Sequence, residues 1–158
     1  MMNLSLKQLL FKIGIGTVAI LAGAVVVLLG DKLLGINLAL FYGIGTFSPI
    51  WVLDLFFVPF IAGIVVSLIY GLGGKILAHA SPLIVHIVSY VQLNNGGVLP
   101  DGASILPMGY WILVIIVAIE FSAFGGFIGE IIVKRTYGRT RDKSKLHKKY
   151  QKLEQTSK

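Results

Sequence analysis

The sequence is organised as long apolar runs separated by short segments rich in glycine, proline or charge. A helix that crosses the hydrocarbon core of a bilayer needs about 20 mostly apolar residues. Three runs approach this length with few polar interruptions, and another does so while carrying two histidines and a proline. The pattern predicts an all-α integral membrane protein with four transmembrane helices, at about residues 13–30, 50–71, 76–93 and 111–133.

The crossing of residues 76–93 is predicted from topology rather than from hydropathy. Lys and Arg concentrate on the cytoplasmic flanks of membrane spans. Lys7 and Lys12 precede the first run, and a basic tail follows the last one. If both termini are cytoplasmic, the number of crossings must be even, so we expect residues 76–93 to cross. The alternative is that this segment re-enters the membrane and leaves three crossings.

The segments between the runs carry signals that break helices. Residues 33–49 are apolar but are interrupted by three glycines and Pro49. We expect them to lie along the membrane interface or to fold back rather than to cross. Residues 94–109 contain Asn-Asn-Gly-Gly and Pro-Asp-Gly, which predict turns in a loop on the outer side.

Composition places these helices in a bilayer. Of the 158 residues, 56% are hydrophobic and 13% are charged, and the mean hydropathy is +0.85. Soluble domains average about 25% charged residues, so this chain cannot cover its surface with polar groups. We predict one transmembrane domain over residues 1–133. The chain has no cysteine, which excludes a disulfide, a thiolate metal site and a cysteine nucleophile.

Charge is divided unevenly between the body and the tail. Residues 134–158 hold ten Lys or Arg and two acidic residues, a net charge of +8, whereas residues 1–133 hold four basic and five acidic residues, a net charge of −1. On a membrane protein, such a tail is predicted to meet anionic lipid headgroups or a partner subunit, and not nucleic acid. It is either solvated or an amphipathic helix that begins near Asp142. Its candidate contact residues are Lys134, Arg135, Arg139, Arg141, Lys148 and Lys149.

Glu120 lies near the middle of the last apolar run. A charged side chain at the centre of a spanning helix costs about 3 kcal/mol on insertion scales, so we expect Glu120 to face protein or a cavity, or to be protonated. The opposite side of the helix carries a stripe of small residues, which lets helices approach closely. We expect other subunits to complete this packing; the alternative is that the stripe packs internally and Glu120 pairs with His86. The helix-packing stripe consists of Ser122, Gly125, Gly126 and Gly129.

Asp54, His79 and His86 are the other intramembrane polar candidates. Asp54 is either a residue at the helix end that reaches the interface or a functional group. The two histidines are seven residues apart, which is about 10 Å along a helix and too far for one metal ion unless the helix breaks at Pro82. The third histidine, His147, lies in the tail. We predict no metal site and no cofactor within this chain, and leave open a metal or haem shared with a partner subunit.

No complete reaction site is evident in the sequence. The GLGGK segment lacks the spacing and the Ser or Thr of a phosphate-binding loop, and Ser104 lacks the context of a nucleophile elbow. Glu130 is expected to pair with Lys134 one helical turn away.

We therefore expect a non-catalytic accessory subunit of a larger membrane complex, of the respiratory, oxidase or monooxygenase type. Its partners would be other integral membrane subunits, and its location the plasma (inner) membrane with both termini cytoplasmic. The alternative is a small proton- or ion-coupled transporter or channel that works as a homo-oligomer. A third hypothesis is a membrane enzyme that acts on lipid or quinone.

Overall fold

The computed structural model describes the backbone of residues 2–156, and the side-chain environments of residue 6 and residues 8–136. Within this part of the chain, four helices are long and apolar enough to cross a membrane. They confirm the prediction of a largely helical, multi-pass membrane protein. These spans cover Gln8–Leu34, Gly43–Tyr70, Gly74–Asn94 and Met108–Thr136.

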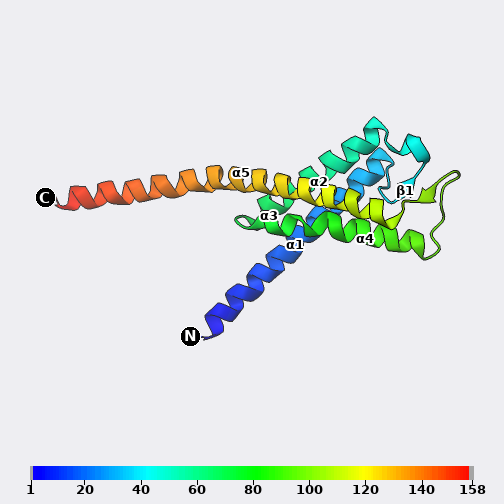
Figure 1. Ribbon diagram of the computed structural model, residues 1–158. Helices are drawn as coiled ribbons and strands as arrows, with labels where there is room; N and C mark the ends of the chain where they lie inside the picture. Colours follow the sequence, from blue (N-terminus) through cyan, green and yellow to red (C-terminus); the bar gives the residue numbers. More distant parts are fainter. Residues whose placement is uncertain (1, 157–158) are drawn as a thin grey trace.

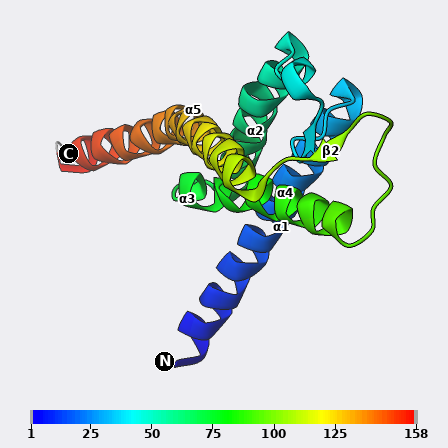
Figure 2. The same cartoon turned by 45° about the vertical axis from the view of Figure 1, so that its right-hand side comes forward.

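Helices α2 and α5 form the most extensive helix pair, and α1 packs on α2. Figures 1 and 2 show the first part of α1 and the last part of α5 projecting from the same end of the bundle. We call this the termini end, and we call the opposite end, which carries strands β1 and β2, the loop end. The helices are α1 (Met2–Leu34), α2 (Pro49–Tyr70), α3 (Gly74–Ala78), α4 (Ala80–Asn94) and α5 (Met108–Thr156).

Local sequence sets both ends of α2. The Ser48 hydroxyl accepts a hydrogen bond from the Trp51 backbone N–H at 3.2 Å, which caps the first turn. Pro49 follows the cap at a position where a missing N–H costs nothing, because that N–H would have no partner within the helix. The helix ends at Gly71, whose φ of 85° suits glycine.

The third span is built from two helices rather than one. Gly73, with a φ of 95°, completes the turn from α2 into α3. Helix α3 ends at Ala78, His79 interrupts the helical pattern, and α4 begins at the next residue. Pro82 accounts for a break here, because it has no N–H to donate to the carbonyl of Ala78 four residues earlier.

Residues 35–48, the part of the 33–49 segment that lies between α1 and α2, fold back at the loop end, which is one of the two arrangements expected for it. They contain β1 (Leu40–Phe41) and a short 3₁₀ helix, η1 (Gly43–Thr46). Strand β1 pairs antiparallel with β2 (Ser104–Ile105), and the Leu106 N–H extends the pairing with a 2.8 Å bond to the Ala39 carbonyl. The pairing joins the first loop to the last loop and closes the bundle at this end.

Helix α5 runs unbroken for 49 residues. The sequence suggested that a tail helix would begin near Asp142, but the backbone is helical from the membrane span through Gly138 and on to Thr156. The amphipathic character proposed for the tail lies outside the residues whose side chains are described.

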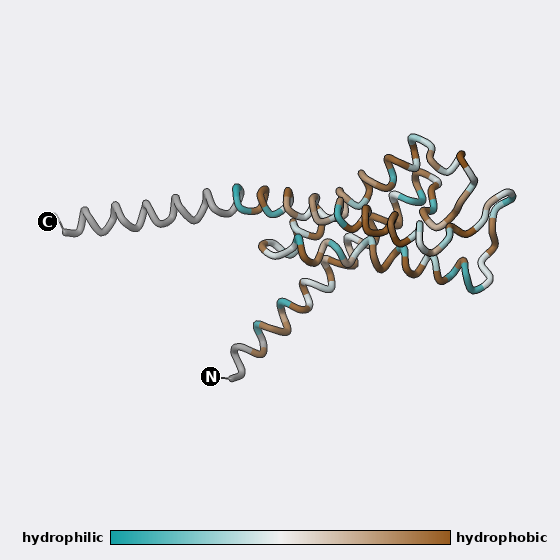
Figure 3. Tube along the Cα trace, in the orientation of Figure 1, coloured by the Kyte–Doolittle hydropathy of each residue, from teal (hydrophilic) through white to brown (hydrophobic). Residues whose placement is uncertain are grey.

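Apolar residues predominate along the membrane spans (Figure 3), and many of their large hydrophobic side chains are exposed. An exposed apolar surface of this extent is unsuited to water, whereas acyl chains solvate it well. The exposed apolar side chains and the amino-acid composition therefore both indicate that lipid is the main solvent of this chain. Large exposed hydrophobic side chains occur on α1 through α5 and include Phe11, Leu21, Phe57, Ile76, Ile84 and Leu113.

Candidate functional site

The small-residue stripe of α5 packs against α2 of the same chain. A Cβ atom added to Gly125 would collide with the backbone carbonyl of Phe60. In the reverse direction, a Cβ added to Gly63 on α2 would collide with the backbone carbonyl of Ser122. The two backbones are therefore in direct contact, as stripes of this kind permit.

The rest of the stripe faces α3 and the second half of α2. A Cβ atom on Gly126 would lie 2.7 Å from the Cα of Lys75, and one on Gly129 would lie 2.7 Å from the Cβ of Ser67. The whole stripe is thus covered within the chain. This is the alternative that the sequence left open, and it means that the stripe needs no other subunit.

Ser122 has a second role at this contact. Its hydroxyl donates a 2.8 Å hydrogen bond to the carbonyl of Ala78. That carbonyl is the one for which Pro82 has no N–H, so Ser122 supplies the missing donor. Because an unpaired buried carbonyl is costly, this bond stabilises the junction between α3 and α4.

Glu130 closes the same region from the α5 side. Its carboxylate accepts hydrogen bonds from the backbone N–H groups of Gly73, at 2.9 Å, and Lys75, at 3.2 Å. These are unpaired donors at the start of α3, and a carboxylate there is stabilised by the helix end. The expected ion pair with Lys134 is wrong, because Glu130 is 7% exposed and its carboxylate faces α3 instead.

Glu120 lies on the exposed surface of α5, away from the stripe. It lines a shallow hollow of about 340 Å³ together with Ala123, Phe124 and Phe127. His86 faces the interior on α4 and is 3% exposed, so the expected alternative of a Glu120–His86 pair does not occur. Within this chain, Glu120 has an apolar surface around it.

Asp54 and His86 are brought together with Asp31 near the loop end. Asp54 is 1% exposed and His86 is 3% exposed. The Nδ1 atom of His86 lies 4.0 Å from a carboxylate oxygen of Asp31, which is the one ion-pair contact among the described residues. The carboxyl groups of Asp31 and Asp54 lie within interaction range of each other. Three helices, α1, α2 and α4, thus each contribute one titratable side chain.

Sequence reasoning missed Asp31 because it lies just after the predicted end of the first span. The signal was present, since Asp31 is the only acidic residue before Asp54 and directly follows an apolar run of 18 residues, 13–30. A carboxyl group at such a boundary can face water or the interior. Only the packing of α1 on α2 and α4 decides that it joins the interior cluster.

His79 does not join His86. It is half-buried at the break between α3 and α4, and its Nδ1 lies 3.1 Å from the carbonyl oxygen of Ile76. In the part of the chain that is described, no three His, Asp or Glu side chains are grouped in a way that could hold a metal ion.

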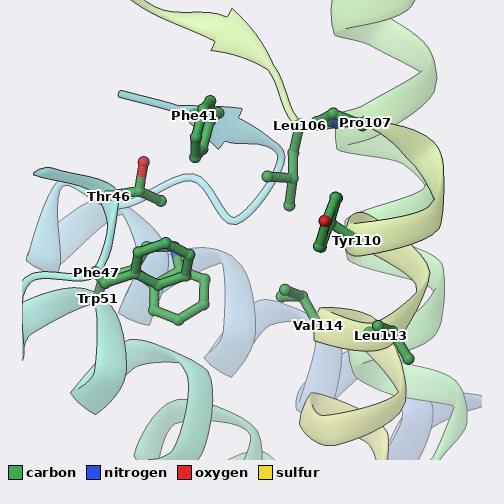
Figure 4. A pocket seen from close by; sticks show the side chains of 9 residues that line it. All are labelled: Phe41, Thr46, Phe47, Trp51, Leu106, Pro107, Tyr110, Leu113 and Val114. Carbon is green, nitrogen blue, oxygen red and sulfur yellow. The ribbon is translucent and has the colours of Figure 1, made fainter. Parts of the chain in front are cut away.

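An apolar pocket of about 440 Å³ lies at the loop end between α2 and α5 (Figure 4). Aromatic rings from β1, from the segment that begins α2 and from the first turn of α5 surround it, so it is suited to an apolar group such as an acyl chain. The Thr46 hydroxyl oxygen accepts a hydrogen bond from the Tyr42 backbone N–H. Its lining residues are Phe41, Thr46, Phe47, Trp51, Leu106, Pro107, Tyr110, Leu113 and Val114.

The basic tail is described only at its beginning. Lys134 and Arg135 are exposed on α5 at the termini end. The other candidate tail contacts lie outside the residues whose side chains are described; they are Arg139, Arg141, Lys148 and Lys149.

Comparison with known proteins gives no relative from which a role could be carried over: no protein-family model, curated protein or solved structure matches this chain.

Proposed function

We propose that this chain is a non-catalytic integral membrane subunit that docks onto another membrane subunit through the surface around Glu120. The observation that carries the proposal is the position of Glu120 in the middle of the α5 span, exposed on the surface of the chain. A carboxylate at that depth costs about 3 kcal/mol in contact with lipid. A partner that covers it removes the cost.

The surroundings of Glu120 suit a protein partner better than a lipid tail. Phe124 is 61% exposed and Phe127 is 51% exposed, and they flank the hollow at Glu120. A side chain from a neighbouring helix can enter the hollow and place a donor against the carboxylate. We expect this donor to be an Arg, Lys or His side chain within a transmembrane helix, because a charge-assisted bond is strongest away from water.

Orientation in the membrane follows from the basic residues. The positive-inside rule puts Lys134, Arg135 and the rest of the tail on the cytoplasmic side. The N-terminus lies at the same end of the bundle (Figure 1), so it is cytoplasmic too. In this orientation the tail meets anionic headgroups of the inner leaflet or a cytoplasmic part of the partner.

Site-specific crosslinking tests the docking surface. A photoreactive residue at Ala123, in the hollow, should give one discrete adduct with another membrane protein in the native membrane. The same residue at Leu28 on α1, which is 55% exposed, serves as the control and should give lipid adducts only.

Glu120→Leu should weaken both the adduct and co-purification in mild detergent, and Glu120→Gln should weaken them less, because the amide still accepts a hydrogen bond. The proposal fails if Ala123 crosslinks only to lipid. It also fails if an adduct of this kind forms equally well in the Glu120→Leu variant.

A second candidate function is supported by the cluster of Asp31, Asp54 and His86. Buried ionisable groups in a membrane span are functional candidates by default. A small proton- or ion-coupled transporter, acting as a homo-oligomer, would use them as its coupling site. Reconstituted vesicles should then show flux that Asp54→Asn and His86→Ala abolish. Unchanged flux in both variants contradicts this function, and an adduct of twice the chain mass at Ala123 supports it over a hetero-complex.

A further inference from the structure

The cluster near the loop end has acceptors that no donor satisfies. Both carboxyl oxygens of Asp54 are buried without a hydrogen-bond partner among the described residues, and so is Nε2 of His86. Buried polar atoms in proteins are nearly always paired, and an unpaired one costs stability. Among the described residues, neither Lys nor Arg forms an ion pair with Asp31 or Asp54, so any positive charge in the cluster has to come from a proton.

The two carboxyl groups identify what is missing. The carboxyl groups of Asp31 and Asp54 interact with each other, yet two ionised carboxylates are both acceptors and cannot form a hydrogen bond. One proton placed on either group turns this contact into an O–H···O hydrogen bond. The same proton removes one of two like charges from the interior.

The groups facing the cluster are few. Helix α1 contributes Asp31, α2 contributes Asp54 and α4 contributes His86. Helix α5 packs on α2, but its Glu120 lies on the outer surface and Glu130 is bonded at the start of α3. The described residues offer no three-ligand group for a metal ion, so a proton is the cation that this geometry accommodates.

Further polar groups follow Asp31 and His86 along the chain toward the loop end. Asp31 lies in the last turn of α1, and its side chain is 18% exposed. Just beyond it, the Asn37 side-chain oxygen accepts a 3.3 Å hydrogen bond from the Ser89 hydroxyl and a 3.0 Å bond from the Ala39 N–H. Ser89 is one helical turn from His86 on α4.

We propose that Asp31, Asp54 and His86 form an intramembrane proton-binding site that exchanges protons with the aqueous phase at the loop end. In loading, a carboxylate oxygen forms an O–H bond with a proton from hydronium, and a water molecule is released. Release reverses this step. This inference rests on the residues of the second candidate function, but the site requires neither flux nor a partner subunit. Loss of proton binding would contradict the site, whereas absence of flux with proton binding intact would contradict only the transport function.

Infrared difference spectroscopy of the full-length protein in lipid nanodiscs tests the site. Spectra recorded at two pH values should contain the carbonyl-stretch band of a protonated carboxylic acid, which Asp54→Asn removes and Asp31→Asn shifts or removes. Two controls bracket this result: Glu120→Gln and the loop variant Asp101→Asn should leave the band in place. The absence of the band, or its survival in both Asp54→Asn and Asp31→Asn, would overturn the proposal.

Further measurements address the identity of the cation and the side of access. A band that responds to sodium at constant pH would make the occupant a metal ion and contradict the proton assignment. In oriented vesicles, a pH jump on the loop-end side should change the band faster than a jump on the termini side. Asn37→Leu should slow that exchange severalfold while leaving the band position unchanged; equal rates from both sides would refute the proposed route.

Discussion

The two ends of the bundle treat buried polar groups in opposite ways. Toward the termini end, Glu130 accepts two backbone hydrogen bonds, and the hydroxyls of Ser81 and Ser122 each donate to a backbone carbonyl. Toward the loop end, Asp54 and His86 are buried to a similar degree, yet three of their polar atoms have no partner among the described residues. Similar burial therefore accompanies two different outcomes.

The difference separates buried polar residues that stabilise the fold from those that lower its stability. A satisfied polar group at a helix end or helix break completes the backbone bonding that the membrane requires. An unsatisfied one lowers stability by about 1–3 kcal/mol and calls for another explanation, such as a ligand. Ser67 is the exception toward the termini end, because its buried hydroxyl also lacks a partner.

The largest expected effect comes from closing the glycine contact. Gly125→Leu forces a side chain against the Phe60 carbonyl, which is backbone and cannot move aside. We expect a loss of more than about 3 kcal/mol, seen as little folded protein in size-exclusion chromatography. Gly109→Leu is the matched control, because an added Cβ there meets nothing within 4 Å. Equal stability of the two variants would show that α2 and α5 do not pack as described.

Removing the carboxylate at the start of α3 should have the next largest effect. Glu130→Leu loses two charge-assisted hydrogen bonds and leaves two N–H groups unpaired, at a cost of about 3 kcal/mol. Glu130→Gln should lose roughly half as much, because its amide oxygen still accepts. Hydrogen exchange at the Gly73 and Lys75 amides should accelerate in both variants. Unaltered exchange would mean that Glu130 does not cap α3.

Sequence alone predicted most of the helical architecture but only part of this contrast. Apolar runs revealed the spans because run length is a local property. The stripe at Gly125 predicted close packing, but its partner surface, centred on Gly63, carries no signal that distinguishes the same chain from another subunit. The bonds from Glu130 join residues 55 and 57 positions apart, and the two-residue strands are too short to show a pattern. Long-range pairing therefore decided what the sequence left open.

Asp54→Leu should change stability in the opposite direction from Glu130→Leu. At a pH above that at which the site binds its proton, leucine removes two unpaired buried oxygens and leaves apolar contacts of similar volume, so we expect a gain of about 2 kcal/mol in the unfolding free energy. Thermal unfolding in one detergent would compare the two variants directly. Should Asp54→Leu destabilise the protein as much as Glu130→Leu does, Asp54 belongs with the structural polar groups.

The smallest effect tests the repair of the helix break. Ser122→Ala should cost about 1 kcal/mol, because the Ala78 carbonyl loses its donor. In a Pro82→Ala background, the new backbone N–H can bond that carbonyl, and Ser122→Ala should then cost less. A double-mutant cycle measures this coupling. If the stability losses of the two substitutions simply add, Ser122 does not compensate for the N–H that Pro82 lacks.

Helix α5 runs from just after strand β2 to the basic end of the chain without a helix break. From Thr136, where the span ends, to Thr156 the helix extends about 30 Å at the ordinary helical rise. A small tilt imposed in the bilayer then displaces the far end of the helix in proportion to this length. A molecule bound to the C-terminal end of α5 would be displaced when the bundle tilts, and a force applied to that end would tilt the bundle.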